Sequence, residues 1–124
     1  MQLVQDFPEG YLHFRAGNAQ TATIGDRIIT RSFLLAPDRL VEDWPVLAAA
    51  GFDLAAADAV AALDPEVVLL GTGARQVFPP REAMAALMRR HIGVDVMDNA
   101  AAYRTYNLLA GEGRRVVAAI ILAA

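Results

Sequence analysis

The sequence predicts an α/β fold in which an antiparallel β-rich half precedes alternating strands and helices. Between Gly10 and Pro45, apolar and polar residues alternate around glycine-containing turn pairs, as in antiparallel strands. From Leu54 onwards, short continuous apolar runs alternate with segments of helical period. This second pattern predicts parallel βαβαβ units with right-handed crossovers. A length of 124 residues corresponds to one domain, so we expect a single domain over 1–124 with residues 1–9 as a loosely ordered arm.

Turn-forming pairs divide the first half into strands. Residues 11–15 alternate between apolar and polar, which indicates a strand with one buried face. Gly25-Asp26 separates residues 21–24 from a long stretch at Arg27–Leu35, and glycine in the first turn position predicts a type II′ hairpin. A further short extended piece is expected from Leu40 to Trp44.

The second half is expected to begin with an alanine-rich helix at Leu54–Leu63. Val67–Leu70 and Val94–Met97 are continuous or nearly continuous apolar runs, typical of strands covered on both faces. A helix should follow from the N-cap pair Asp98-Asn99 to Ala110, and a strand over Arg115–Leu122 closes the pattern. The buried face of that helix is predicted to comprise Ala102, Thr105, Tyr106 and Leu109.

The helix between the two runs should start at Pro80 and reach about His91, because proline suits a first helical turn. Gly93 follows, where glycine commonly ends a helix. Its apolar stripe at spacings of three and four is Met84, Leu87, Met88 and His91.

Composition excludes several kinds of chemistry. The net charge is −3, which argues against binding to nucleic acid or to an anionic membrane surface. All 11 basic residues are arginine, so neither a Schiff-base lysine nor a phosphate-binding P-loop lysine is available. Without cysteine there is no thiolate nucleophile, and Ser32 lacks the surroundings of a nucleophile elbow. The first residues do not resemble a signal peptide and Val116–Ala124 is too short to span a bilayer, so we expect a cytoplasmic protein without direct membrane insertion.

The turn Gly71-Thr72-Gly73 is the first candidate site. It follows a buried strand, where open α/β sheets place ligands, and its backbone N–H groups can hold an anion with Arg75 as counter-charge. Gln76 stands where a dinucleotide-binding fingerprint needs glycine. The alternative is a sharp turn that needs positive φ, with Phe78 anchoring the loop.

Asp98 and Asn99 are the second candidate, at the end of the neighbouring strand. If the two strands are adjacent, this pair faces the Gly71–Arg75 loop across one crevice, where Asp98 can act as a general base or metal ligand. The alternative is that Asp98 simply caps the helix that follows.

A third candidate lies on the outer face of the last helix. Arg104 and Asn107 are three residues apart and are expected to point outward, where they can bind a carboxylate or a partner surface. A solvated helix face explains them equally well. His13 and His91 do not have metal-site spacing, and we expect neither a metal site nor a cofactor.

Several blocks of the second half together resemble the DUF498 family of proteins of unknown function. The blocks are Leu69–Gly73, Phe78-Pro79-Pro80, Ile92–Asp98, Ala101–Leu109 and Glu112–Val116. The resemblance implies three layers around a mixed central β-sheet and brings no catalytic residue with it. One family member acts as an assembly factor through a protein partner.

Two alternative functions are therefore expected. The first is a non-catalytic interaction or assembly factor for a multi-protein, membrane-associated complex, using Arg104 and Asn107. The second is a small-molecule-binding protein or enzyme that uses the crevice of Gly71, Thr72, Gly73, Arg75, Asp98 and Asn99. Fold alone does not decide between them.

Overall fold

The computed structural model describes residues 9–122, so most of the predicted N-terminal arm lies outside the described residues. A mixed five-stranded sheet forms the centre of the molecule and a three-stranded antiparallel sheet lies beside it. The larger sheet has the spatial order β5 (Arg39–Val41), β4 (Phe33–Ala36), β8 (Val116–Ile120), β6 (Val67–Gly71) and β7 (Gly93–Met97). The smaller one consists of β1 (Ala16–Gly17), β2 (Ala22–Ile24) and β3 (Arg27–Ile29). The helices are η2 (Ala49–Gly51), α1 (Leu54–Ala61), α2 (Arg81–Arg89) and α3 (Asn99–Gly111).

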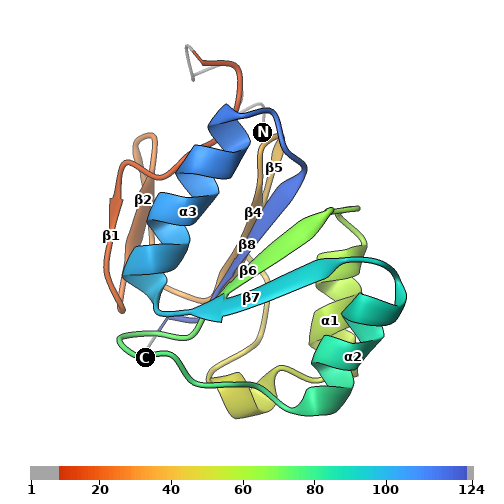
Figure 1. The fold of residues 1–124 in the computed structure, drawn as a ribbon. Coiled ribbons are helices and arrows are strands. Elements are labelled where there is room, and N and C mark those ends of the chain that lie inside the picture. The colour runs from red at the N-terminus through yellow and green to blue at the C-terminus, as the bar shows by residue number, and fades with distance from the viewer. Residues whose placement is uncertain (1–8, 123–124) are drawn as a thin grey trace.

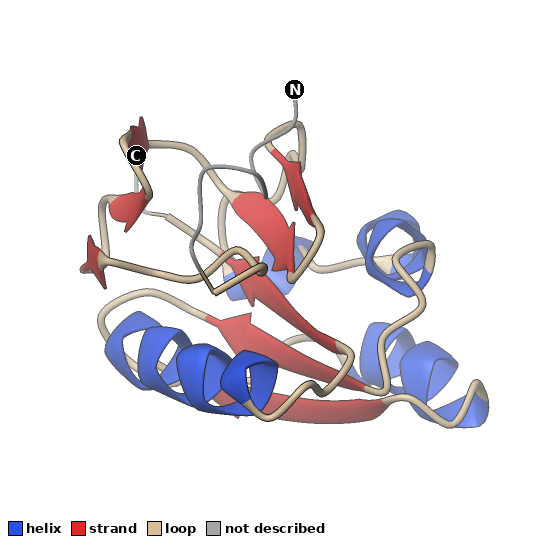
Figure 2. Ribbon diagram, turned by 90° about the horizontal axis from the view of Figure 1, so that it is seen from above, coloured by secondary structure: helices blue, strands red, loops and turns tan. Residues whose placement is uncertain are grey.

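The elements form three layers, as the family resemblance implies. Helix α3 lies on one side of the five-stranded sheet, and α1 and α2 lie on the other (Figure 1). Seen from above, the strands run between helices on either side (Figure 2). The three-stranded sheet shares a hydrophobic cluster with α3 and therefore belongs to the same layer.

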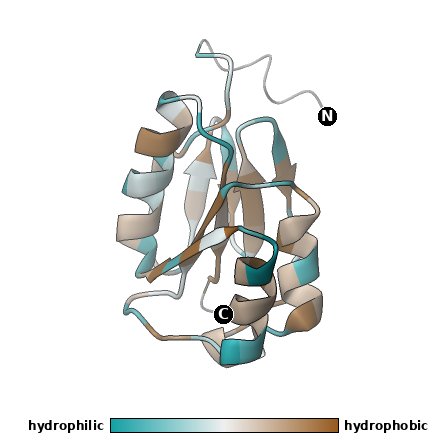
Figure 3. Ribbon diagram, turned by 45° about the vertical axis from the view of Figure 1, so that its right-hand side comes forward, coloured by the Kyte–Doolittle hydropathy of each residue, from teal (hydrophilic) through white to brown (hydrophobic). Residues whose placement is uncertain are grey.

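Alternating residues of the central strands build two separate cores. In β4, Phe33 and Leu35 face α3 and the small sheet, whereas Leu34 faces α1 and α2. Strands β6 and β8 divide their side chains in the same way. This explains why these strands are apolar at every position, since successive side chains point to opposite faces and both faces are covered. In Figure 3 the central strands accordingly carry the hydrophobic colour.

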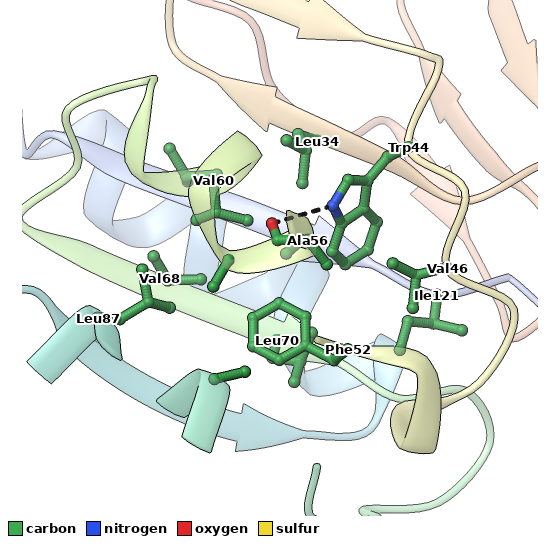
Figure 4. Close-up of a cluster of buried hydrophobic side chains, with 14 of the residues drawn as sticks. Leu34, Trp44, Val46, Phe52, Ala56, Val60, Val68, Leu70, Leu87 and Ile121 are labelled. Carbon is green, nitrogen blue, oxygen red and sulfur yellow. Dashed lines mark hydrogen bonds between the residues drawn. The ribbon is translucent and has the colours of Figure 1, made fainter. Parts of the chain in front are cut away.

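The core under α1 and α2 is organised around Trp44. Its indole Nε1 donates a hydrogen bond of 3.3 Å to the carbonyl oxygen of Ala56 in α1, and its ring lies edge-on to Phe52 (Figure 4). The bond satisfies the polar end of an otherwise apolar side chain, which burial requires.

The predicted strand at Arg27–Leu35 is wrong as a single element. The chain leaves the small sheet after β3 and enters the large sheet at β4, so one apolar stretch serves two sheets. Ser32 lies at the crossing, where its buried Oγ accepts a hydrogen bond of 3.1 Å from the amide of Leu122. The Gly25-Asp26 hairpin is confirmed, because Ile24 pairs with Arg27 and Gly25 has a φ of 60°.

The predicted strand at residues 11–15 is also corrected. Leu12 and Phe14 are buried as expected, but the structure assigns only Ala16–Gly17 to β1. The carbonyl of Leu12 and both backbone groups of Phe14 bond to side chains of α3. The amide of Arg15 bonds to the carbonyl of Thr23 in β2, and the amide of Leu12 bonds to the carbonyl of Pro37.

Helix α2 ends differently from the prediction. His91 has the left-handed φ of 61°, and the amide of Ile92 bonds to the carbonyl of Leu87, which together make a Schellman cap. Gly93 instead begins β7, where its amide bonds to the carbonyl of Glu66. His91 lies beyond the end of the helix and is exposed. Met88 is exposed within the helix, whose buried residues are Ala83 and Leu87.

The three apolar runs of the second half lie side by side, as predicted. Strand β6 pairs in parallel with both β7 and β8, so Gly71 is opposite Met97 on one side and Ile120 on the other. The carboxyl ends of all three strands therefore meet at one edge of the sheet.

Candidate functional site

The carboxyl ends of β6 and β7 form a switch point of the sheet. The chain leaves β6 towards α2 on one face and leaves β7 towards α3 on the other (Figure 1). In open α/β sheets such a divergence creates the crevice in which ligands bind. The structure does bring the Gly71–Arg75 loop and the Asp98–Asn99 pair together at this point.

Asn99 fills the space between these segments. Its side chain is almost completely buried, with its Oδ1 accepting a hydrogen bond of 2.9 Å from the amide of Gly73. Its Nδ2 donates a bond of 3.0 Å to the carbonyl of Ile121, just after β8. The backbone amide of Asn99 also donates a hydrogen bond of 2.8 Å to the carbonyl of Gly73. One side chain thus joins the ends of β6, β7 and β8.

Gly71 has no space for a side chain because of Asn99. A Cβ atom at this position would lie 2.5 Å from the Asn99 Oδ1 and 2.9 Å from the Ile120 Cδ1. The requirement for glycine is therefore steric, whereas Gly73 has the positive φ of 100° expected of a sharp turn.

The side chains of Asp98, Thr72 and Gln76 are paired within the protein, whereas Arg75 is exposed. Asp98 caps α3, accepting a hydrogen bond of 2.8 Å from the amide of Ala101. The Thr72 hydroxyl donates to the carbonyl of Arg75 at 2.6 Å and accepts from the amide of Val77 at 3.0 Å. Gln76 donates to the carbonyl of Val96 on β7 at 2.8 Å. These contacts match the capping and turn interpretation, and they hold the loop against the sheet.

The loop exposes two apolar side chains. Val77 is 46% exposed and Phe78 is 67% exposed. The expectation that Phe78 anchors the loop is wrong, because Pro79 is the buried residue there. The path of the loop decides which of the two adjacent apolar residues, Phe78 or Pro79, is buried. The loop has no periodic pattern of apolar residues from which this could be predicted.

Three polar side chains of α3 hold the chain on both sides of β1, at Leu12 and Phe14 before it and at Asn18 after it. The hydroxyl of Tyr103 donates to the carbonyl of Asn18 at 2.8 Å and that of Tyr106 to the carbonyl of Leu12 at 2.8 Å. The side-chain amide of Asn107 accepts from the Phe14 amide and donates to the Phe14 carbonyl, both at 2.8 Å. The Asn107 side chain therefore satisfies both backbone groups of Phe14, as a paired strand would.

The solvent-exposed face of α3 contains fewer residues than the sequence predicts. Asn107 does not point outward as expected, because its amide is bonded to Phe14. Tyr103 and Ala110 are buried, whereas Thr105 and Leu109 are only half-buried. Arg104 is exposed as expected, and no ion pair with it is seen among residues 9–122. A glycine at position 17 belongs to this arrangement, since a Cβ there would lie 2.4 Å from the Tyr103 ring.

The two tyrosines are held in their neutral form. Burial raises the pKa of Tyr103. Burial also raises the pKa of Tyr106, and the negative charge of Asp38 acts in the same direction. Both hydroxyls can therefore serve as hydrogen-bond donors throughout the physiological range.

Within residues 9–122 no group of three or more histidines, aspartates or glutamates is placed to hold a metal ion. Across the same residues, no helix has the length and apolar character that crossing a bilayer requires. Two hollows of the described chain do not include Asn99, Asp98 or the Gly71–Arg75 loop in their lining. One of about 350 Å³ lies beside Trp44 and Leu122, and one of about 240 Å³ lies between β1 and α3.

Two named proteins share part of this sequence. A 13 kDa major membrane protein of Francisella tularensis subsp. holarctica (strain LVS) is 41% identical over 64 residues, 52% of each chain. A Danio rerio NADH dehydrogenase (ubiquinone) 1 alpha subcomplex assembly factor 3 is 43% identical over 56 residues, 45% of this chain and 32% of that protein. The matched region thus spans about half of the first relative and about a third of the second.

The fold and the sequence together are shared more widely. A Xanthomonas campestris protein whose structure was determined by NMR is 50% identical, with a TM-score of 0.83 covering 90% of this chain and 84% of that one. A family model described as a protein of unknown function (DUF498/DUF598) matches residues 14–121, nearly the whole described chain. The resemblance seen in the sequence blocks is confirmed, and the chain belongs to the DUF498 family.

Proposed function

We propose that this protein is a non-catalytic interaction module, an assembly-type factor that binds a protein partner through the loop carrying Val77 and Phe78. The observation that carries the proposal is an exposed aromatic side chain on a tightly held loop. Phe78 is 67% exposed, while Thr72, Gln76 and Pro79 fix the segments on either side of it.

This combination favours recognition of a protein. Aromatic residues dominate the binding energy of many protein interfaces, and they do so most effectively when little conformational freedom is lost on binding. The hydrogen bonds of Thr72 and Gln76 already restrict the loop before any partner arrives. Docking at Phe78 would therefore bury apolar surface at a small entropic cost.

The name of the Danio rerio relative supports the class of partner. That protein is an assembly factor of an NADH dehydrogenase subcomplex, and this chain shares 43% identity over 56 residues with it. By extension we propose a multi-protein, membrane-associated assembly as the setting in which this chain acts.

The contacts at the switch point favour this proposal over the small-molecule alternative. The N–H of Gly73 is bonded to the buried Asn99, and Asp98 is occupied as a helix cap. A ligand in that crevice would have to displace the Asn99 side chain and leave the carbonyl of Ile121 without its present partner. Arg75 is exposed beside the turn.

A capture experiment with a matched control tests the proposal. Tagged wild-type protein, Phe78→Ala and Leu108→Ala should be expressed at equal levels in the native host. Leu108 is a suitable control because it is 62% exposed on α3, so both changes remove an exposed apolar side chain. We expect a partner at near-equal stoichiometry with the wild type and with Leu108→Ala, and its recovery reduced about tenfold or more with Phe78→Ala, the range of an interface hot spot.

Circular dichroism should show both variants folded, since neither side chain belongs to a core. Equal recovery with all three proteins would contradict a role for Phe78. Recovery of only background proteins with the wild type would contradict the interaction module itself.

A further inference from the structure

A shallow groove separates β1 from α3. It has a volume of about 240 Å³ and is lined on one side by residues 14–17 and on the other by α3 residues that include Ala100, Tyr103 and Arg104. We call it the β1–α3 groove. Its Ala100 end adjoins the Gly73 turn, because the neighbouring Asn99 amide bonds to the Gly73 carbonyl. The groove thus lies beside the start of the loop that carries Phe78.

The charge of the groove is opposite to that of the whole protein. Among residues 9–122, the charged residues that line it are Arg15 and Arg104, and no carboxylate does. The Arg15 guanidinium bonds to the carbonyl of Gly25 at 3.3 Å and lies 3.9 Å from the fully exposed Asp26. Arg104 makes no ion pair within the described chain. The lining of the groove is therefore basic on a protein with a net charge of −3, with Asp26 as the carboxylate nearest to the Arg15 guanidinium.

The walls of the groove are fixed in place. Tyr103 is bonded to Asn18, Asn107 is bonded to Phe14, and the Phe14 and Tyr103 rings lie 4.6 Å apart. The lack of a side chain at Gly17 keeps β1 close to the Tyr103 ring. Arg15 and Arg104 therefore belong to two segments that are cross-linked to each other, one on each side of the groove.

We propose that the β1–α3 groove binds an acidic, extended segment of the partner protein, with carboxylates paired to Arg15 and Arg104. The guanidinium group forms two parallel hydrogen bonds with a carboxylate, so arginine on both walls suits an extended chain with acidic side chains. The proposal rests on the proposed function for the origin of this segment, but its chemistry can be tested without the partner.

The test uses the full chain and a fluorescein-labelled peptide of six glutamates, with a peptide of six glutamines as the uncharged comparison. Because the protein is acidic as a whole, non-specific attraction cannot explain binding of the glutamate peptide. We expect anisotropy to report binding of this peptide only, weakening between 50 mM and 500 mM salt because exposed charges are screened. In a ¹⁵N spectrum the amides of Gly17 and Arg104 and the side-chain amide of Asn107 should shift.

Variants that remove one positive charge show which arginines contact the glutamate peptide. Arg104→Gln and Arg15→Gln should each weaken binding about threefold and together about tenfold, the range of exposed, independent ion pairs. Arg89→Gln is the matched control, since Arg89 is an exposed arginine on α2, on the opposite side of the sheet. Its binding should equal that of the wild type.

Each other outcome would overturn the proposal. Equal weakening by Arg89→Gln would show a diffuse charge effect, and equal binding of the glutamine peptide would show that carboxylates are not recognised. Displacement of the peptide by equimolar inorganic phosphate would mean that the groove takes free anions. A spectrum that shifts in the same way on raising the protein concentration alone would identify a second copy as the occupant. None of these results bears on Phe78, so failure here and failure of the capture experiment can be told apart.

Discussion

At the scale of single residues, two adjacent side chains at the start of α3 have separate tasks. Asp98 turns to the helix and caps it, and Asn99 turns into the protein and joins the ends of β6 and β8. The sequence identifies both as good capping residues, and for Asp98 that is sufficient. The role of Asn99 depends on Ile121, which is 22 residues away and reaches it only through the pairing of β8 with β6.

Removal of the Asn99 side chain should destabilise the protein strongly. Asn99→Ala leaves the amide of Gly73 and the carbonyl of Ile121 without their partners, and we expect the free energy of unfolding to fall by about 2–4 kcal/mol. Urea denaturation followed by circular dichroism measures this. The control is Gln20→Ala, which truncates an exposed amide and should change stability by less than about 0.5 kcal/mol. Similar values for both variants would show that Asn99 does not cross-link the strand ends.

At the scale of elements, a strand or helix can be predicted from the sequence when its own residues form a recognisable pattern. It cannot be predicted when its bounds depend on contacts with distant segments. Strands β6 and β8 are predictable because both of their faces are covered and their apolar runs record this directly. Strand β7 is also predictable from its apolar run, although it lies at the edge of the sheet with Asp95 exposed. The division of Arg27–Leu35 between two sheets is not predictable, since the break is set by the partners of each half. Asn107 is predicted to be a surface residue for the same reason, because its partner is distant in the sequence. Its side-chain amide is paired with Phe14, 93 positions earlier.

Helix α3 should make stability sensitive to high pH. Tyr103 and Tyr106 have raised pKa values in the folded protein, whereas unfolded tyrosines ionise near pH 10. Above that pH the unfolded state loses protons that the folded state retains, so the free energy of unfolding should fall. The slope is about 1.4 kcal/mol per pH unit for each tyrosine. Below about pH 9.5 these two groups should contribute no pH dependence.

The contribution of the two tyrosines can be isolated by substitution. The double variant Tyr103→Phe with Tyr106→Phe should be less stable than the wild type at pH 7, because two hydrogen bonds are lost. The difference between wild type and variant should narrow as the pH is raised from 9.5 to 11. Urea denaturation at each pH gives this difference, and a gap that stays constant would contradict burial of the neutral hydroxyls.

At the scale of the whole molecule, the two sheets differ in how completely they are enclosed. Strand β8 is buried along its whole length and has a paired strand on each side, whereas β1 has two residues and β2 and β3 have three each. The small sheet also carries Ile28, which is 67% exposed. Stability should therefore be unequal between the two sheets even though they share a hydrophobic cluster.

Hydrogen exchange should separate the sheets. Amides of β8 and β6 should exchange only through global unfolding, with protection equal to the free energy of unfolding from urea. Amides of β2 and β3 should exchange faster, through local opening of the small sheet. Mass spectrometry of peptides from the two regions measures both. Equal protection in β2 and β8 would mean that the molecule opens as a single unit.

The position of β8 has a consequence for synthesis on the ribosome. Strand β8 lies between β4 and β6 but follows both of them along the chain. Until its residues leave the exit tunnel, the pair β4–β5 and the pair β6–β7 share no neighbour, and each presents an unpaired apolar edge. Between the emergence of β7 and that of β8 from the tunnel, the nascent chain therefore has only two incomplete half-sheets, and chaperones or identical nascent chains on the same message have access to their edges.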